Sequence, residues 1–328
     1  MGFKRILLYL YLIAGSLQAA SVADLTFTLN ADNTEYYVTD CVEDANGDLV
    51  IPSTYNDLPV TVIGSKAFFS CSDLNSIIIP EGITIIGNEA FNECTSLSSV
   101  SIPDSVTTIG NIAFRNCNFN TIVIPNSVIS IGDSAFNNCD NLSTLSIGDS
   151  VITIGNNAFY DCDNLSNLSI GDSVITIGDQ AFFSCSGLSV VTIGDSVKTI
   201  GTQAFYSCNS LTSVSIGDSV KTIGTQAFAY CANLLGVTIP DSVTRIESRA
   251  FQYCTELRGA TLNISEEVVV ADAAFENCEK LRTIIIAGTG TVSGTSNSFN
   301  GTSGSKIVIL NSAGVNLYSF GSNFYNYV

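Results

Sequence analysis

The sequence contains no histidine and no tryptophan, and only 13% of its 328 residues are charged. Without histidine, the chain cannot form sites in which histidine acts as general acid or base, activates a nucleophile or binds zinc. A glycine-rich phosphate-binding motif between a strand and a helix is also missing. Carboxylates are present, but they fall on repeated turns rather than around one pocket. We therefore predict that the chain is not an enzyme and uses no cofactor.

Basic residues are scarce as well. The chain has 12 lysines and arginines against 30 aspartates and glutamates, and its formal net charge is −18. Proteins that bind nucleic acid need a basic face, and binding to anionic lipid needs basic clusters. The charge therefore predicts no nucleic-acid partner and no attraction to an anionic membrane. It is compatible with weak binding of divalent cations or of basic partners.

The N-terminus has the pattern of a secretory signal peptide. Lys4 and Arg5 precede the apolar residues 6–14, and small residues between about 19 and 23 offer cleavage sites. The apolar run is too short for a transmembrane helix, and no later segment is expected to span a membrane. We predict a signal peptide over residues 1–20 and a mature protein that is secreted or held at the cell surface.

A repeat of about 23 residues dominates the rest of the chain. A phenylalanine recurs in register, and a cysteine follows three residues after ten of its eleven copies: Phe68, Phe91, Phe114, Phe136, Phe159, Phe182, Phe205, Phe228, Phe251, Phe275 and Phe299. A unit this short cannot bury its apolar face alone, whereas stacked units bury a continuous core. The repeat predicts a single solenoid rather than several domains.

Residues 142–164 show the pattern of one unit. Leu142, Leu145 and Ile147 mark a strand with one buried face, and Gly148-Asp149 reads as a turn. A second short extended stretch, Ser-Val-x-x-Ile-Gly, comes before Ala-Phe-x-x-Cys. The period and the Leu-x-x-Leu-x-Leu pattern are those of leucine-rich repeats. We predict a β-rich solenoid with a parallel sheet on one face and little helix.

The motif Ile-Pro-x-Ser-Val-x-x-Ile-Gly-x-x-Ala-Phe-x-x-Cys-x-x-Leu resembles the BspA-like leucine-rich repeat family. Residues 239–257 follow this pattern except that Glu247 replaces the glycine, and residues 102–119 follow it with Phe119 in place of the final leucine. The resemblance covers about residues 49–287. It implies a right-handed solenoid on a secreted or cell-surface protein, and some members of that family act in adhesion.

Both ends depart from the repeat. We expect an N-terminal cap of short strands over residues 21–60, the repeat array over 61–287 and a C-terminal cap over 288–328. Such caps shield apolar columns and strand edges that would otherwise aggregate.

The ten repeated cysteines form a file along the solenoid. Disulfide bonds or a metal site would explain them, but the geometry of stacked strands argues against both. Equivalent residues of stacked strands lie about 4.8 Å apart with parallel side chains, whereas disulfides need converging Cβ atoms about 3.8 Å apart. A straight file of thiols does not form a tetrahedral metal site either. We predict small buried packing residues. Cys41 lies outside the file and is either free or paired.

A file of acidic residues occupies the turn: Asp149, Asp172, Asp195, Asp218 and Asp241. One interpretation is a turn cap in each unit. The other is a row of weak calcium sites, because hard oxygen ligands suit that ion. Lys198 and Lys221 neutralise part of the column and weaken the second interpretation.

The outward positions of the leucine-rich strands form the candidate face. They are small and rich in hydroxyls: Ser99, Ser101, Thr144, Ser146, Asn167, Ser169, Val190, Thr192, Ser213 and Ser215. Solenoids often bind ligands on such a concave face. The alternative is that serine and threonine simply suit exposed positions of strands and have no binding role. If the face binds, hydroxylated polymers or extended peptides fit it better than a compact protein hot spot.

Together these observations predict an exported, non-enzymatic repeat protein. It presents an extended surface to an extracellular protein or polysaccharide, and adhesion is one form of that role. The alternative is a structural or surface-coat solenoid that self-associates or binds calcium along the acidic file.

Overall fold

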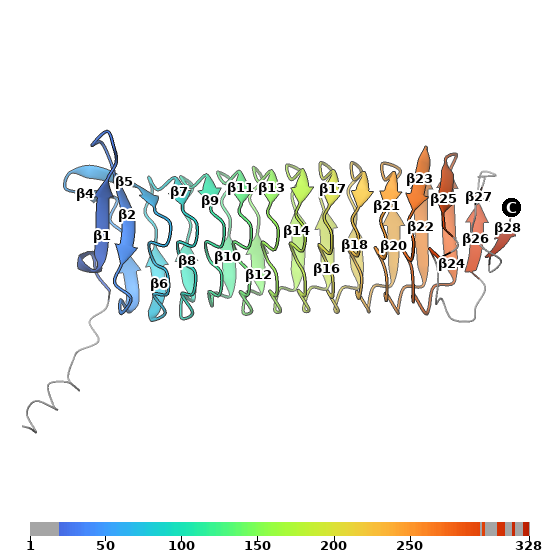
Figure 1. Ribbon diagram of the computed structural model, residues 1–328, viewed down its shortest axis with the longest axis horizontal. Helices are drawn as coiled ribbons and strands as arrows, with labels where there is room; N and C mark the ends of the chain where they lie inside the picture. Colours follow the sequence, from blue (N-terminus) through green and yellow to red (C-terminus); the bar gives the residue numbers. More distant parts are fainter. Residues whose placement is uncertain (1–19, 296, 299–306, 312–316, 319–323, 328) are drawn as a thin grey trace, which may run out of the picture.

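The computed structural model describes residues 20–295, 297–298, 307–311, 317–318 and 324–327. The predicted signal peptide and Phe299 lie outside these residues, as does much of the predicted C-terminal cap. The described chain winds into a β-solenoid in which successive coils stack along the long axis (Figure 1). Among the described residues, the one helical element is the short 3-10 turn η1 (Val22–Asp24).

One side of the solenoid is a continuous sheet of 15 strands, parallel apart from the N-terminal pairs. Its equivalent residues pair in register, as in Thr153 with Thr176 and Ile154 with Ile177. The strands are β1 (Leu25–Leu29), β2 (Tyr36–Cys41), β4 (Thr54–Tyr55), β5 (Leu58–Ile63), β7 (Ile85–Ile86), β9 (Thr108–Ile109), β11 (Ser130–Ile131), β13 (Thr153–Ile154), β15 (Thr176–Ile177), β17 (Thr199–Ile200), β19 (Thr222–Ile223), β21 (Arg245–Ile246), β23 (Glu267–Val270), β25 (Thr291–Gly294) and β27 (Leu317–Tyr318).

A second side carries the leucine-rich strands, which form shorter parallel ladders. They are β3 (Gly47–Val50), β6 (Leu74–Ile78) and β8 (Ser99–Ser101); β10 (Thr121–Val123) and β12 (Thr144–Ser146); β14 (Asn167–Ile170), β16 (Val190–Ile193) and β18 (Ser213–Ser215); and β20 (Gly236–Ile239), β22 (Gly259–Ile264), β24 (Thr283–Gly288), β26 (Ile307–Asn311) and β28 (Phe324–Tyr327). The β-rich parallel solenoid is thus confirmed. The structure adds that the second extended stretch also pairs, because stacking in register satisfies its backbone groups from coil to coil.

The phenylalanines form one buried file through the solenoid. Neighbouring rings from Phe68 to Phe275 lie with centroids 4.8–5.3 Å apart and planes within 12° of parallel. All of them are fully buried. The backbone holds this spacing, since the N–H of Phe182 donates to the carbonyl of Ala204 at 2.8 Å. Each ring therefore completes the core of its neighbours on both sides.

The cysteines pack beside this file. All eleven are free and buried, including Cys41. From Cys94 to Cys278, each thiol lies against the phenylalanine carbonyl of a preceding coil, as in Cys185 Sγ to Phe159 O at 3.1 Å. Cys71 lies instead against the Val42 carbonyl at 3.7 Å. Burial raises the pKa of the Cys139 thiol to about 12. The prediction of buried packing residues is confirmed.

The Ile-Gly position brings successive backbones close together. A Cβ added at Gly178 would lie 2.6 Å from the carbonyl carbon of Gly155, and at Gly201 2.5 Å from that of Gly178. No side chain fits at such distances. The column is broken at Glu247, and the next coil carries the longer strand β23.

At the N-terminal end, β1 and β2 form an antiparallel hairpin, and β2 continues in parallel into β5. The Phe27 and Tyr55 rings stack at 4.1 Å, with Tyr36 edge-on to both. These aromatic residues pack against the end of the core. At the other end, parallel ladders continue past residue 287 into β26 and β28.

Candidate functional site

The ten predicted residues of the candidate face lie together as predicted. They occupy outward, exposed positions of β8, β12, β14, β16 and β18. Alternation along each strand sends Leu168 and Val191 inward and Ser169 and Thr192 outward. Because the strands pair in register, Ser169 stands beside Thr192. The face is thus a surface of short, mostly hydroxylated side chains.

Hydroxyls on this side fall into two groups. Those just before each strand form hydrogen bonds between successive coils: Ser166 donates to the Ser143 carbonyl at 3.3 Å, and Ser189 to the Ser166 carbonyl at 2.9 Å. The outward hydroxyls of the strands differ. Within the described part of the chain, Thr144, Ser146, Ser169, Thr192, Ser213 and Ser215 make no side-chain hydrogen bond. They remain available to a ligand as both donors and acceptors.

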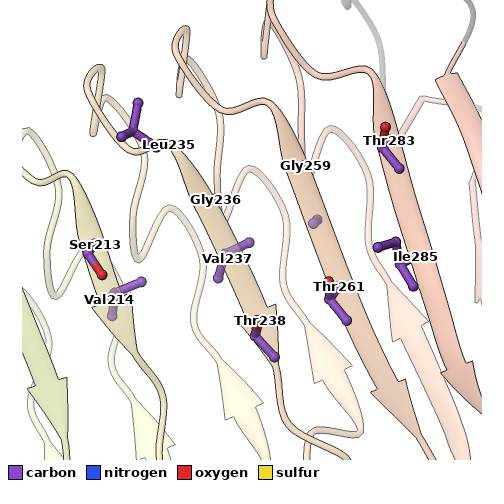
Figure 2. Close-up of a pocket in the computed structure, with 11 residues that line it drawn as sticks. Ser213, Val214, Leu235, Gly236, Val237, Thr238, Gly259, Thr261, Thr283 and Ile285 are labelled. Carbon is purple, nitrogen blue, oxygen red and sulfur yellow. The ribbon is translucent and has the colours of Figure 1, made fainter.

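Two shallow hollows lie along the face. The first, of about 370 Å³, crosses β12, β14 and β16 and is lined by five of the predicted residues among others: Thr144, Asn167, Ser169, Val190 and Thr192. The second, of about 440 Å³, crosses β18, β20, β22 and β24 (Figure 2). We call these the first hollow and the second hollow.

The second hollow extends beyond the predicted residues, of which only Ser213 lines it. Its central positions are Gly236 and Gly259, and its borders include Leu235 and Ile285 (Figure 2). Both of these apolar side chains are substantially exposed, at 47% and 38%. The sequence did carry a signal, namely glycine at an outward strand position that holds a side chain in the other coils.

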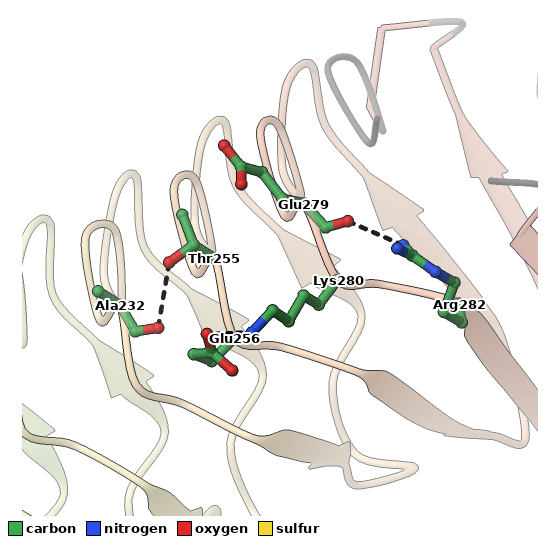
Figure 3. Close-up of polar contacts among 6 residues, drawn as sticks. All are labelled: Ala232, Thr255, Glu256, Glu279, Lys280 and Arg282. Carbon is green, nitrogen blue, oxygen red and sulfur yellow. Dashed lines mark hydrogen bonds and ion pairs between the residues drawn. The ribbon is translucent and has the colours of Figure 1, made fainter. Parts of the chain in front are cut away.

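Figure 3 shows Lys280 and Arg282 together with Glu256 and Glu279. Lys280 pairs with Glu256 in the neighbouring coil. Arg282 donates through Nη1 to the carbonyls of Glu279 at 2.8 Å and Leu281 at 3.1 Å. The Arg282 guanidinium is therefore held by neutral carbonyls and makes no ion pair with a carboxylate of the described residues.

The aspartate file has a structural role that the sequence showed only in part. The N–H of Asp195 donates to Oδ1 of Asp172 at 3.0 Å, and that of Asp218 to Oδ1 of Asp195 at 3.1 Å. These carboxylates cap the turn of the following coil rather than their own. Within the described residues, no group of three or more histidine, cysteine, aspartate or glutamate side chains is placed to hold a metal ion. Calcium binding by single carboxylates along the file stays a prediction.

Sequence reasoning missed a file of half-exposed aromatic rings on the turn side. It comprises Tyr160, Phe183, Tyr206, Tyr230 and Tyr253, with centroids 4.7–5.1 Å apart. The available signal was a second aromatic residue directly after the core phenylalanine in four coils, three of which contribute to this file. Nearby, burial and neighbouring carboxylates raise the pKa of Asp161.

Comparison with known proteins accounts for the repeat. The family model for the BspA type leucine-rich repeat region matches residues 61–189, 135–258, 176–306 and 260–327. The chain belongs to this family. No curated protein matches the chain.

Solved structures of bacterial leucine-rich repeat proteins resemble this chain. A leucine-rich repeat protein of T. pallidum is 24% identical, with a TM-score of 0.49, over 66% of this chain and 91% of its own. A leucine-rich cell surface protein of Faecalibacterium prausnitzii is 26% identical, with a TM-score of 0.37, over 83% and 95%. The pneumococcal vaccine antigen PcpA is 17% identical, with a TM-score of 0.43, over 95% and 99%. A search of the described residues for a helix long and apolar enough to cross a membrane finds none.

Proposed function

We propose that this chain is an exported, non-enzymatic binding protein whose candidate face holds an extended segment of an extracellular protein or polysaccharide. The observation that supports this most directly is the row of outward hydroxyls without partners, interrupted by the two hollows. The hydroxyls just before the strands, such as those of Ser166 and Ser189, donate to carbonyls of the preceding coil. Hydroxyls without partners are therefore a feature of the outward positions.

An extended ligand suits the geometry better than a compact one. Equivalent side chains recur about every 4.8 Å along the axis, so a polymer lying on the face meets the same chemistry in successive coils. Each contact is weak, but contacts along one chain add up. The face has no tyrosine, tryptophan or arginine among its ten predicted residues, and such anchors dominate compact protein interfaces.

The test uses mature protein against immobilised matrix proteins and a glycan array. Ser146→Lys with Ser169→Lys places two long charged side chains in the face. Thr153→Lys with Thr176→Lys is the matched control, since these exposed threonines lie on the continuous sheet of the same coils. Loss of about tenfold in affinity for the retained polymer, or about 1.4 kcal/mol, is expected for the first pair only. Equal binding by both double variants excludes the candidate face.

A second candidate function is self-association into a surface coat. It is favoured by three exposed isoleucines that stack beside the continuous sheet, Ile129, Ile152 and Ile175. Light scattering of the mature chain separates the two roles. Ordered multimers that disappear in Ile152→Thr support a coat, and clean monomers of the unmodified chain exclude it.

A further inference from the structure

The second hollow exists because two strand residues lack side chains that the fold would accept. A Cβ added at Gly236 would lie 3.7 Å from the nearest atom beyond the adjacent residues, and at Gly259 3.6 Å, which is ordinary van der Waals contact. Neither glycine has a left-handed φ. In contrast, a Cβ at Gly224 would lie 2.6 Å from backbone of the preceding coil. Packing thus explains Gly224, whereas neither packing nor backbone conformation explains Gly236 or Gly259.

Glycine inside a strand weakens it, because it packs nothing and loses more conformational freedom on folding. Other coils fill the same outward position with Thr144, Val190 or Thr283. Two successive coils leave it empty, which opens the floor of the second hollow. Glycine in a strand is also a mark of a place where a ligand approaches the backbone closely.

Positive charge borders this floor in an otherwise acidic chain. The residues directly before Gly236, Gly259 and Thr283 are Leu235, Arg258 and Arg282, and their backbones bond in register at 3.0 Å. Leu235 lines the second hollow from this column. The Arg258 residue is exposed, and its side chain makes no hydrogen bond or ion pair within the described chain. Lys280, in contrast, is neutralised by Glu256 (Figure 3).

The walls supply groups of a second kind. Ser213, Thr238, Thr261 and Thr283 line the second hollow, and their hydroxyls have no partner among the described residues. The guanidinium groups bind planar anions such as carboxylates through paired N–H donors. The hydroxyls can donate and accept. The hollow therefore has hydroxyls on its walls and no side chain at Gly236 and Gly259, while Arg258 and Arg282 follow Leu235 in the column beside it.

We infer that the second hollow binds a carboxylated sugar residue of a polysaccharide, with the carboxylate at Arg258 and Arg282 and the ring over Gly236 and Gly259. This inference rests on the proposed function and names its ligand class. A peptide is the poorer occupant, because β22 and β24 each pair with strands on both sides and offer no free edge to its backbone. β20 pairs with β22, and on its other side the Leu235 N–H just before it donates to the Thr212 carbonyl at 3.2 Å. The hydroxyls of a sugar ring match those of the walls.

Filling the floor gives the first test. Gly259→Thr introduces the residue found at the equivalent position of the next coil, Thr283. We expect its melting temperature to equal or exceed that of the unmodified protein, while affinity for the sugar falls about tenfold or more. Retained binding with a filled floor overturns the inference. A melting temperature well below that of the unmodified protein contradicts the argument that the glycines are not needed for folding.

Removing the charge gives the second test. Arg258→Gln and Arg282→Gln should each weaken binding about tenfold, since hydrogen bonds to charged groups contribute more than neutral ones. Arg249→Gln is the matched control. It removes the same charge from an exposed turn position where three other coils already carry glutamine. An equal effect of all three substitutions would mean that only net charge matters and overturns the site.

The probes are oligogalacturonate and sialyllactose, with methyl-esterified oligogalacturonate and lactose as their neutral counterparts and polyglutamate as the peptide. Calorimetric binding of either acidic glycan, with about tenfold weaker binding of its neutral counterpart, supports the inference and shows which acid is preferred. Equal binding of acidic and neutral glycans leaves the proposed function standing and overturns the carboxylate site. Binding of polyglutamate alone, or of no glycan at millimolar concentration, also overturns it. In the glycan array, the Ser146 and Ser169 substitutions are compared with those of Gly259, Arg258 and Arg282. If only the first two lower binding, the glycan binds the candidate face outside the second hollow, which overturns the inference.

Discussion

Two glycines of this solenoid should respond to the same substitution in opposite directions. Gly178→Ala places a methyl group 2.6 Å from the carbonyl carbon of Gly155 and 2.7 Å from the backbone nitrogen of Asn156. Gly259→Ala places it 3.6 Å from the Thr283 carbonyl oxygen, which is ordinary van der Waals contact. The first methyl group can be accommodated only by moving one coil away from the next, whereas the second meets no obstacle.

The magnitudes follow from these distances. Overpacking against atoms that cannot move costs about 1–3 kcal/mol. Separation of the coils would also weaken the hydrogen bond from the Gly178 N–H to the Ile154 carbonyl, now 2.9 Å, and such a bond contributes about 1 kcal/mol. We therefore expect Gly178→Ala to destabilise the chain by about 3 kcal/mol. Gly259→Ala should stabilise it by about 0.5–1 kcal/mol, through reduced freedom of the unfolded chain.

The assay is urea unfolding of mature protein, followed by circular dichroism. Because coils of a solenoid unfold as coupled units, the transition midpoints are compared rather than a single two-state free energy. A Gly178→Ala midpoint equal to that of the unmodified protein refutes the steric argument. Gly259→Ala lowering the midpoint as much as Gly178→Ala refutes the distinction between the two columns.

Three further predictions concern the core, the thiols and the aspartate file. Phe182→Ala should cost about 3–5 kcal/mol in urea unfolding, since its ring is fully buried between neighbours at 5.2 and 5.3 Å; half-exposed Phe183→Ala should cost clearly less, and equal costs would contradict the packing argument. Burial raises the pKa of Cys139 from 9.0 to about 12, so the folded state disfavours the thiolate. The contribution of this thiol to the stability of the fold is complete below pH 9.0 and falls as the pH rises from there towards about 12. Thermal melts across that pH range measure it. Iodoacetamide should label the thiols of the native protein far more slowly than those of the unfolded protein. Millimolar calcium should raise the melting temperature slightly, and less in Asp172→Asn with Asp195→Asn; no shift in the unmodified protein rules out calcium binding.

The core could be predicted in detail because a repeat places equivalent residues in contact. Once Phe159 and Phe182 are known to be one coil apart, stacking follows without further information. The same argument excluded disulfides along the cysteine file, and the structure agrees. The candidate face was also placed correctly, because alternation along a strand decides which residues point outward.

Other features depend on neighbours that the repeat pattern does not name. The aromatic file moves from the position after the core phenylalanine at Tyr206 to the position before the cysteine at Tyr230, and the rings still stack at 5.1 Å. Aspartates of the turn bond the next coil rather than their own, which depends on how far one coil is displaced from another. The spacing of residues in the sequence gives neither the distance between these rings nor the displacement between coils.

By itself, the sequence determined the coil length, the buried columns and the outward side of each strand, because these follow from periodicity and from the need to bury apolar side chains. Only the tertiary structure showed what each glycine does. Gly178 lies at the repeated Ile-Gly position and Gly259 at a strand position, but the distances decide that a Cβ would clash with the preceding coil at the first and fit at the second. That difference comes from the distance between stacked coils, and it decides which glycine maintains the fold and which one opens the second hollow.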